Sequence, residues 1–213
     1  MVRVKICGIT RRQDLTIAVD AGVDAVGFIV GFPKSPRNLS LEFAEKLVKH
    51  VPPFVDSVLV TNSGTLSREM ERVVRISPDA IQLHGELLDQ AGARARLRSS
   101  LIKVLQVKSG IHTRLNANLR GYDALLTDTY KKGYDGGTGL VSDWDECSIL
   151  RDKIRPLPLI LSGGLSPGNV VQAITKVRPF AVDASSGVES APGIKDARKI
   201  IEFVRLAKGE AAG

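Results

Sequence analysis

The sequence predicts a single-domain α/β protein with a (β/α)₈ fold, the TIM barrel, and three observations lead to this prediction. Eight short segments rich in β-branched residues recur along the chain, stretches with helical periodicity separate them, and most of the eight end in a small or polar residue. Eight alternating strand–helix units are typical of a closed parallel barrel. Because such a barrel carries its active site at the carboxyl ends of its strands, the last residues of these segments are the first candidates for function.

Each expected strand is a short apolar run. The eight expected strands are residues 2–8, 25–30, 56–61, 80–85, 101–106, 124–129, 157–164 and 180–187.

The expected helices carry apolar residues three or four positions apart. They are residues 12–21, 41–51, 65–76, 86–97, 111–119, a weakly helical stretch after Trp144, 169–177 and 194–207. In the helix over 41–51, Ser40 is a candidate N-cap, and Phe43 and Leu47 are expected on the apolar face.

Length and composition favour one domain over residues 1–213. No run of about 18 apolar residues is present, and the N-terminus lacks the pattern of a signal peptide, so we expect a cytoplasmic protein without a membrane partner. Cys7 and Cys147 are the only cysteines. Their positions suggest neither a disulfide framework nor a zinc site.

The formal net charge of +7 raises the question of nucleic-acid binding. Lys and Arg are spread over most of the helical segments, however, only 5% of residues are aromatic, and no nucleic-acid-binding motif is present. We therefore expect no nucleic-acid partner. A positive field that attracts a phosphorylated small molecule is an additional interpretation.

Side chains two positions apart on a strand share a face. Cys7, His84, Asp128 and Ser185 each lie at the end of an expected strand, two residues after Lys5, Gln82, Leu126 and Asp183 respectively. If the four terminal residues face the barrel mouth, a thiol, an imidazole, a carboxylate and a hydroxyl converge there. Such a mixture would make a poor core, because unpaired buried polar groups cost several kcal/mol.

Two glycine-containing turns suggest a phosphate site. Gly163 and Gly164 end the seventh expected strand, and Ser185, Ser186 and Gly187 end the eighth. Barrels often bind phosphate with the loops after these two strands, where glycine lets backbone N–H groups approach an anion. The alternative is that both are ordinary tight turns. The glycine-rich loop over 133–139 could equally be a mobile lid or a plain flexible loop.

Several motifs follow one another over almost the whole chain. They are KICGIT at 5–10, DAVGF at 24–28, KSPR at 34–37, QLHG at 82–85, Asp128, GGTG at 136–139, DW at 143–144, LSGGL at 161–165, VDASSGVE at 182–189 and PGIKD at 192–196. In this set the chain resembles the phosphoribosylanthranilate isomerases, barrel enzymes of tryptophan biosynthesis. Two positions depart from the family pattern: Leu140 stands where lysine is usual, and Ala184 replaces the commoner valine.

The resemblance implies an Amadori rearrangement of N-(5-phosphoribosyl)anthranilate to 1-(2-carboxyphenylamino)-1-deoxyribulose 5-phosphate. It implies that Asp128 is the general acid that protonates the ring oxygen and that Cys7 is the general base that removes the C2 proton. Arg37 would bind the anthranilate carboxylate. The remaining expected site residues are Gln82, His84 and Asp183 for substrate, and Gly163, Gly164, Ser185, Ser186 and Gly187 for phosphate.

Both catalytic groups would need unusual protonation, because a free carboxyl has a pKa near 3.9 and a free thiol near 8.5. Burial near the substrate's anionic groups would raise the pKa of Asp128, and a nearby positive charge would favour the Cys7 thiolate. Lys5, on the same strand face as Cys7, could supply that charge. Alternatively, Lys5 is a structural partner of Asp183 across the barrel.

Two other functions remain open. The related histidine-pathway isomerase performs the same rearrangement on a bis-phosphorylated substrate, but it uses a carboxylate in place of the strand-one thiol. A non-catalytic barrel that binds nucleic acid is the other alternative. The resemblance implies no cofactor and no metal, since the Schiff base forms from the substrate's own nitrogen. The sequence leaves monomer or homodimer undecided.

Overall fold

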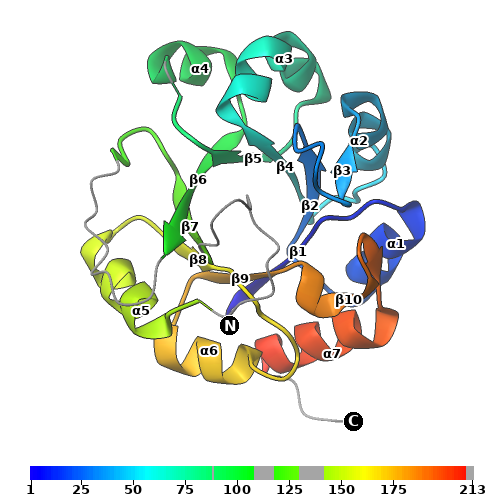
Figure 1. The fold of residues 1–213 in the computed structure, drawn as a ribbon, viewed down its shortest axis with the longest axis vertical. Coiled ribbons are helices and arrows are strands. Elements are labelled where there is room, and N and C mark those ends of the chain that lie inside the picture. Colours follow the sequence, from blue (N-terminus) through cyan, green and yellow to red (C-terminus); the bar gives the residue numbers. More distant parts are fainter. Residues whose placement is uncertain (88, 108–117, 130–141, 210–213) are drawn as a thin grey trace.

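The chain forms a closed barrel of eight parallel strands, seen in a computed structural model that describes residues 1–87, 89–107, 118–129 and 142–209 (Figure 1). The barrel strands are β1 (Arg3–Cys7), β2 (Ala25–Val30), β4 (Asp56–Asn62), β5 (Ala80–His84), β6 (Ser100–Val107), β7 (Ala124–Thr129), β8 (Leu159–Leu161) and β9 (Ala181–Ala184). Each pairs with the next, and β9 pairs with β1 to close the ring. The predicted barrel is confirmed.

Seven α-helices among the described residues form a ring outside the strands (Figure 1). They are α1 (Arg12–Asp20), α2 (Leu41–Val48), α3 (Ser63–Ile76), α4 (Gln90–Arg96), α5 (Trp144–Lys153), α6 (Val170–Val177) and α7 (Ala197–Lys208). Residues 111–117 of one expected helix, the loop over 133–139 and Leu140 lie outside the described residues. None of the helices in the described ranges has the length and apolar character needed to cross a membrane.

Two expectations about the helices are wrong. Phe43 is 43% exposed, and the buried face of α2 consists of Leu41, Ala44 and Leu47 instead, although Ser40 does cap this helix by accepting a hydrogen bond from the Phe43 N–H. The last helix begins at Ala197, not at Ile194, because β10 (Glu189–Ala191) and β11 (Ile194–Lys195) form an antiparallel hairpin just before it.

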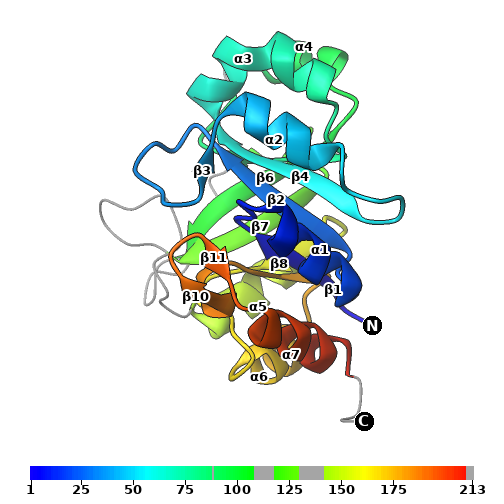
Figure 2. The ribbon, with the colours of Figure 1, turned by 90° about the vertical axis from the view of Figure 1, so that its right-hand side faces the viewer.

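Small elements gather at one end of the barrel. β3 (Asn38–Leu39) extends the sheet beside β2, a 3₁₀ turn η1 (Ser186–Val188) follows β9, and the β10–β11 hairpin comes after it. Figure 2 shows β3 and this hairpin at one end of the barrel and the N-terminus, which leads into β1, at the other. Since the parallel strands all run in the direction of β1, the small elements surround the carboxyl ends of the strands.

The core has two parts. Outward-facing strand residues such as Ile6, Leu59 and Leu125 pack against the helices, whereas the inside of the barrel starts with small and apolar residues, including Ala80 and Ala124. Toward the carboxyl ends, several strands carry polar inward-facing residues, including Gln82, Asp128 and Asp183. The barrel thus has a packed floor and a largely polar mouth.

Candidate active site

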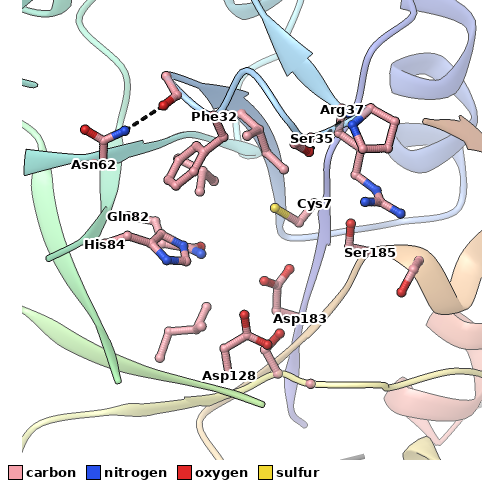
Figure 3. A pocket seen from close by; sticks show the side chains of 18 of the residues that line it. Cys7, Phe32, Ser35, Arg37, Asn62, Gln82, His84, Asp128, Asp183 and Ser185 are labelled. Carbon is pink, nitrogen blue, oxygen red and sulfur yellow. Dashed lines mark hydrogen bonds between the residues drawn. The ribbon is translucent and has the colours of Figure 1, made fainter. Parts of the chain in front are cut away.

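A cavity of about 1050 Å³ opens at the carboxyl ends of the strands, where barrels place their active sites. All eleven site residues expected from the sequence line it: Cys7, Arg37, Gln82, His84, Asp128, Gly163, Gly164, Asp183, Ser185, Ser186 and Gly187. Figure 3 shows Cys7, Asp183 and Asp128 on one side, and Gln82 and His84 facing them from β5. The inward parity predicted for the strand ends is therefore present.

Cys7 is the last residue of β1, and it is 5% exposed. Its register partner on β2 is Gly27, where an added Cβ would lie only 2.8 Å from Cys7 Sγ and 3.2 Å from Lys5 Nζ. The glycine therefore leaves the space that the thiol and the ammonium group occupy side by side.

Lys5 lies below Cys7 and is buried. Its Nζ donates to Gln82 Oε1 and to Asp183 Oδ2, each at 3.0 Å. Burial alone would lower the pKa of Lys5, but the charges of Asp183 and Cys7 outweigh it and raise that pKa. The ion pair with Asp183 is thus present, and Lys5 also lies close enough to Cys7 to favour its thiolate form over the neutral thiol.

Replacing Lys5 with methionine is expected to reduce the free energy of unfolding by about 3–5 kcal/mol, because it leaves the Asp183 carboxylate buried without its counter-charge. Urea denaturation measures the loss. The double variant Lys5→Met/Asp183→Asn, which removes both charges, should regain most of it. A loss below about 1 kcal/mol, as for an exposed ion pair, would contradict the expectation.

Asp128 lies near the end of β7 and inside the cavity. Burial raises its pKa to about 6, and the nearby Asp183 charge adds to this, although the Thr129 N–H, which donates to Asp128 Oδ1 at 2.8 Å, opposes it. The direction agrees with the expectation for a general acid, and burial is its largest cause.

A general base at Cys7 requires an ionised thiol, which a lowered pKa would favour. Burial raises the pKa of Cys7 above its usual value, even though Lys5 and Lys195 pull it down. In the free protein Cys7 is accordingly a neutral thiol at pH 7. The two positive neighbours limit the rise without reversing it.

Arg37 crosses the end of β1 and is 8% exposed. Its stem lies over Gly8, where an added Cβ would come within 2.6 Å of Arg37 Cδ. Nε and Nη2 donate to Glu189 Oε1 and Oε2 at 2.7 and 2.6 Å. One edge of the guanidinium is therefore occupied by Glu189, whereas Nη1, on its other edge, makes no hydrogen bond within the part of the chain that the structure describes.

The loops after β8 and β9 meet at the cavity, and Ser185, in the loop after β9, lies beside Arg37 (Figure 3). Gly163 and Gly164 have positive φ angles of 95° and 64°. A Cβ on Gly187 would lie 2.0 Å from the Leu165 carbonyl oxygen, so the two loops touch through a glycine. The first N–H groups of a helical turn such as η1 have no partner within the turn, so this region can bind an anion.

Sequence reasoning missed several cavity residues. Phe32 meets the His84 ring edge-on, with the ring centroids 5.2 Å apart. Asn62 Nδ2 donates to the Gly31 carbonyl at 2.7 Å and holds the loop that carries Phe32 (Figure 3). Asn62 ends β4 and shares the inward parity of His84, so the strand pattern could have revealed it; Phe32 lies in a loop, where no such pattern exists.

Within the described ranges, no three His, Cys, Asp or Glu side chains are grouped to hold a metal ion.

Comparison with known proteins gives consistent results. Residues 4–206 match the family model described as N-(5'phosphoribosyl)anthranilate (PRA) isomerase. The chain is 43% identical over 213 residues to the N-(5'-phosphoribosyl)anthranilate isomerase of Natronomonas pharaonis, an alignment that covers 98% of this chain and 99% of that protein.

Solved structures are similar over 98% of this chain and all of theirs. The phosphoribosyl anthranilate isomerase of Thermotoga maritima has a TM-score of 0.85 at 42% identity. A phosphoribosyl anthranilate isomerase in complex with reduced 1-(o-carboxyphenylamino)-1-deoxyribulose 5-phosphate has a TM-score of 0.82 at 40% identity. A further structure, of monomers generated from the dimeric Thermotoga maritima enzyme, has a TM-score of 0.77 at 37% identity.

Proposed function

The chain belongs to the N-(5'-phosphoribosyl)anthranilate isomerase family, and from this premise we propose that Asp128 and Cys7 carry the two proton transfers of its reaction. It is an isomerase of tryptophan biosynthesis that acts on N-(5'-phosphoribosyl)anthranilate. The observation that carries the proposal is that a carboxyl group with a pKa of about 6 and a thiol face one cavity that is also lined by a guanidinium and by glycine loops.

In the proposed sequence, protonated Asp128 gives its proton to the ribose ring oxygen as the C1–O bond breaks. The nitrogen lone pair forms the C1=N bond of a Schiff base. The Cys7 thiolate then removes the proton from C2, and the resulting enolamine tautomerises to the ketone. Proton transfers of this type contribute roughly 10²- to 10⁴-fold each to enzymatic rates.

The cavity offers groups that suit both anionic groups of the substrate. Arg37 would bind the anthranilate carboxylate through its free edge, and Gly163, Gly164, Ser185, Ser186 and Gly187 would hold the phosphate. Gln82, His84 and Asp183 would contact the sugar between them. A relative has been solved in complex with reduced 1-(o-carboxyphenylamino)-1-deoxyribulose 5-phosphate, a ligand that carries both a carboxylate and a phosphate, which supports a site for both groups.

The experiment that tests the proposed function is an isomerase assay of the purified protein, with phosphoribosylanthranilate generated in situ and loss of its fluorescence as the readout. We expect turnover of this substrate and none of the bis-phosphorylated histidine-pathway intermediate. Turnover of the latter would contradict a specific thiol-dependent enzyme, and salt-dependent RNA or DNA binding without turnover would support the binding barrel instead.

Gly187→Ala is expected to raise KM at least about tenfold, because the new Cβ overlaps the Leu165 carbonyl and must open the phosphate loops. kcat should fall less, since Asp128 and Cys7 lie on other strands. Gly168→Ala in the neighbouring loop is the control, as its Cβ would have 3.8 Å to its nearest neighbour, Ser166 Oγ. Equal KM values for the two variants would argue against a phosphate site here.

The proposal extends to the state of the protein. We expect one barrel domain over residues 1–213 in the cytoplasm, acting as a monomer or homodimer without nucleic-acid or membrane partners. A dimeric relative makes the homodimer a concrete alternative. Sedimentation equilibrium distinguishes the two states by mass.

A further inference from the structure

The β10–β11 hairpin brings two buried charged residues to Arg37. Glu189 begins the hairpin and accepts both hydrogen bonds from the Arg37 guanidinium, although the two residues lie 152 positions apart. Lys195 ends it, and its side chain is 0% exposed. Lys195 Nζ donates to Glu189 Oε1 at 2.9 Å and to the carbonyl oxygen of Ser185 at 3.0 Å.

This unit is anchored to three loops of the cavity. Thr10 Oγ1, after β1, donates to the Gly193 carbonyl at 2.6 Å. Gly193 has a φ of 79°, and an added Cβ there would lie 2.8 Å from the carbonyl oxygen of Pro36, the residue before Arg37. Lys195 reaches the loop after β9 through Ser185. The hairpin therefore contacts both the loop that carries Arg37 and the loop proposed to hold phosphate.

The charges are consistent with a pre-organised anion receptor. Burial alone would raise the pKa of Glu189, but the Arg37 hydrogen bonds and the charge of Lys195 lower it, so Glu189 is ionised. Burial lowers the pKa of Lys195, although the charge of Glu189 and the hydrogen bond to it oppose this. With Lys195 protonated, Arg37 and Lys195 together exceed Glu189 by one positive charge. The bidentate pair with Glu189 also fixes the orientation of the other edge of the Arg37 guanidinium. An arginine side chain without such a partner would have to become ordered when it binds the ligand.

We propose that Glu189 and Lys195 are positioning residues: Glu189 holds the Arg37 guanidinium for the substrate carboxylate, and Lys195 links this arm to the Ser185 loop that holds the phosphate. The proposal rests on the roles of Arg37 and the Ser185 loop proposed above. It gives a role to Glu189 in the motif VDASSGVE and to Lys195 in the motif PGIKD, two residues that have no role in the proposed function. Neither residue touches the reacting atoms.

The test uses two fragments of the substrate as competitive inhibitors, anthranilate for the carboxylate end and ribose 5-phosphate for the phosphate end. In Glu189→Gln, we expect the inhibition constant of anthranilate and the KM of the substrate to rise about tenfold, the usual size of a lost charge-assisted hydrogen bond. The constant for ribose 5-phosphate and kcat should change by less than about twofold. In Lys195→Met, both inhibition constants should rise, and Lys195→Arg should restore part of each.

Lys176→Met is the matched control, because it removes a lysine from an exposed ion pair with Asp145 that lies away from the cavity. Equal changes for the two fragments in Glu189→Gln, or none, would overturn the role of Glu189. A change for anthranilate alone in Lys195→Met would overturn the link to the phosphate loop. Thermal unfolding of each variant shows whether it has kept the fold. If Glu189→Gln has lost it, the milder Glu189→Asp is measured against the same criteria.

Arg37→Lys separates this inference from the proposed function. If Arg37→Lys leaves anthranilate inhibition unchanged, the carboxylate role of Arg37 is wrong and the inference falls with it. If Arg37→Lys weakens anthranilate but Glu189→Gln does not, only the positioning role is wrong.

Discussion

Replacement of Asp128 by asparagine is expected to lower kcat/KM by roughly 10³-fold or more, because the amide keeps the shape of the side chain but has no proton to give to the ring oxygen. Substrate binding, measured as KM, should change little. Asp145→Asn is the control, since that carboxylate is exposed on α5 and pairs only with Lys176 among the described residues. An Asp128→Asn variant with more than about a tenth of the wild-type value would remove Asp128 from the acid role.

The pH dependence gives this prediction a second readout. Catalysis needs Asp128 protonated and Cys7 ionised, yet the pKa of Asp128 is about 6 and that of Cys7 is raised above its usual value. Between these two values, each pH unit lowers the protonated fraction of Asp128 tenfold and raises the thiolate fraction tenfold, so their product is constant.

Wild-type kcat/KM should therefore be level from about pH 6 to the pKa of the Cys7 thiol. It should fall below this range as thiolate is lost, and above it as acid is lost. In Asp128→Asn, the break near pH 6 should vanish, and the residual activity should rise with pH up to the thiol pKa. A wild-type optimum without a break near pH 6 would contradict the role of Asp128.

Cys7→Ser is the second variant with a large expected effect, a loss of roughly 10³-fold in kcat, because a serine hydroxyl does not ionise in the accessible pH range. The residual activity should decline above about pH 6, where only the protonation of Asp128 remains to limit it. Cys147→Ser is the matched control: this buried cysteine lies on α5, outside the cavity. Activity in Cys7→Ser close to that of Cys147→Ser would move the base elsewhere, with His84 the next residue to test.

The sequence predicted the features that depend on local periodicity. The order and parity of the strands placed Cys7, Gln82, Asp128 and Asp183 correctly in the cavity, because a strand alternates its faces whatever its surroundings. Periodicity could not reveal the pairing of Arg37 with Glu189, which joins the segment after β2 to the β10–β11 hairpin. The start of the last helix was misplaced at Ile194 for a related reason: residues 189–195 form their hairpin against other loops, and that contact is not a local signal.

The protonation of the site could not be predicted from the sequence either, because it depends on three-dimensional packing. Two lysines near Cys7 were not sufficient to make it a thiolate, because the loss of hydration in the buried site has the larger effect. The presence of Lys5 can be read from the sequence, but the extent of its burial cannot.

The alternation of inward and outward residues along the strands also makes the activity depend on strand register. Inward and outward residues alternate singly, so a slip of one position in β1 would turn Cys7 toward the helices and expose Ile6 to the barrel interior. A compact but misaligned barrel could therefore keep much of its helical signal and still lack the acid–base pair. Recovery of catalysis during refolding reports the correct alignment of the strands, which spectroscopic measures of secondary structure do not distinguish.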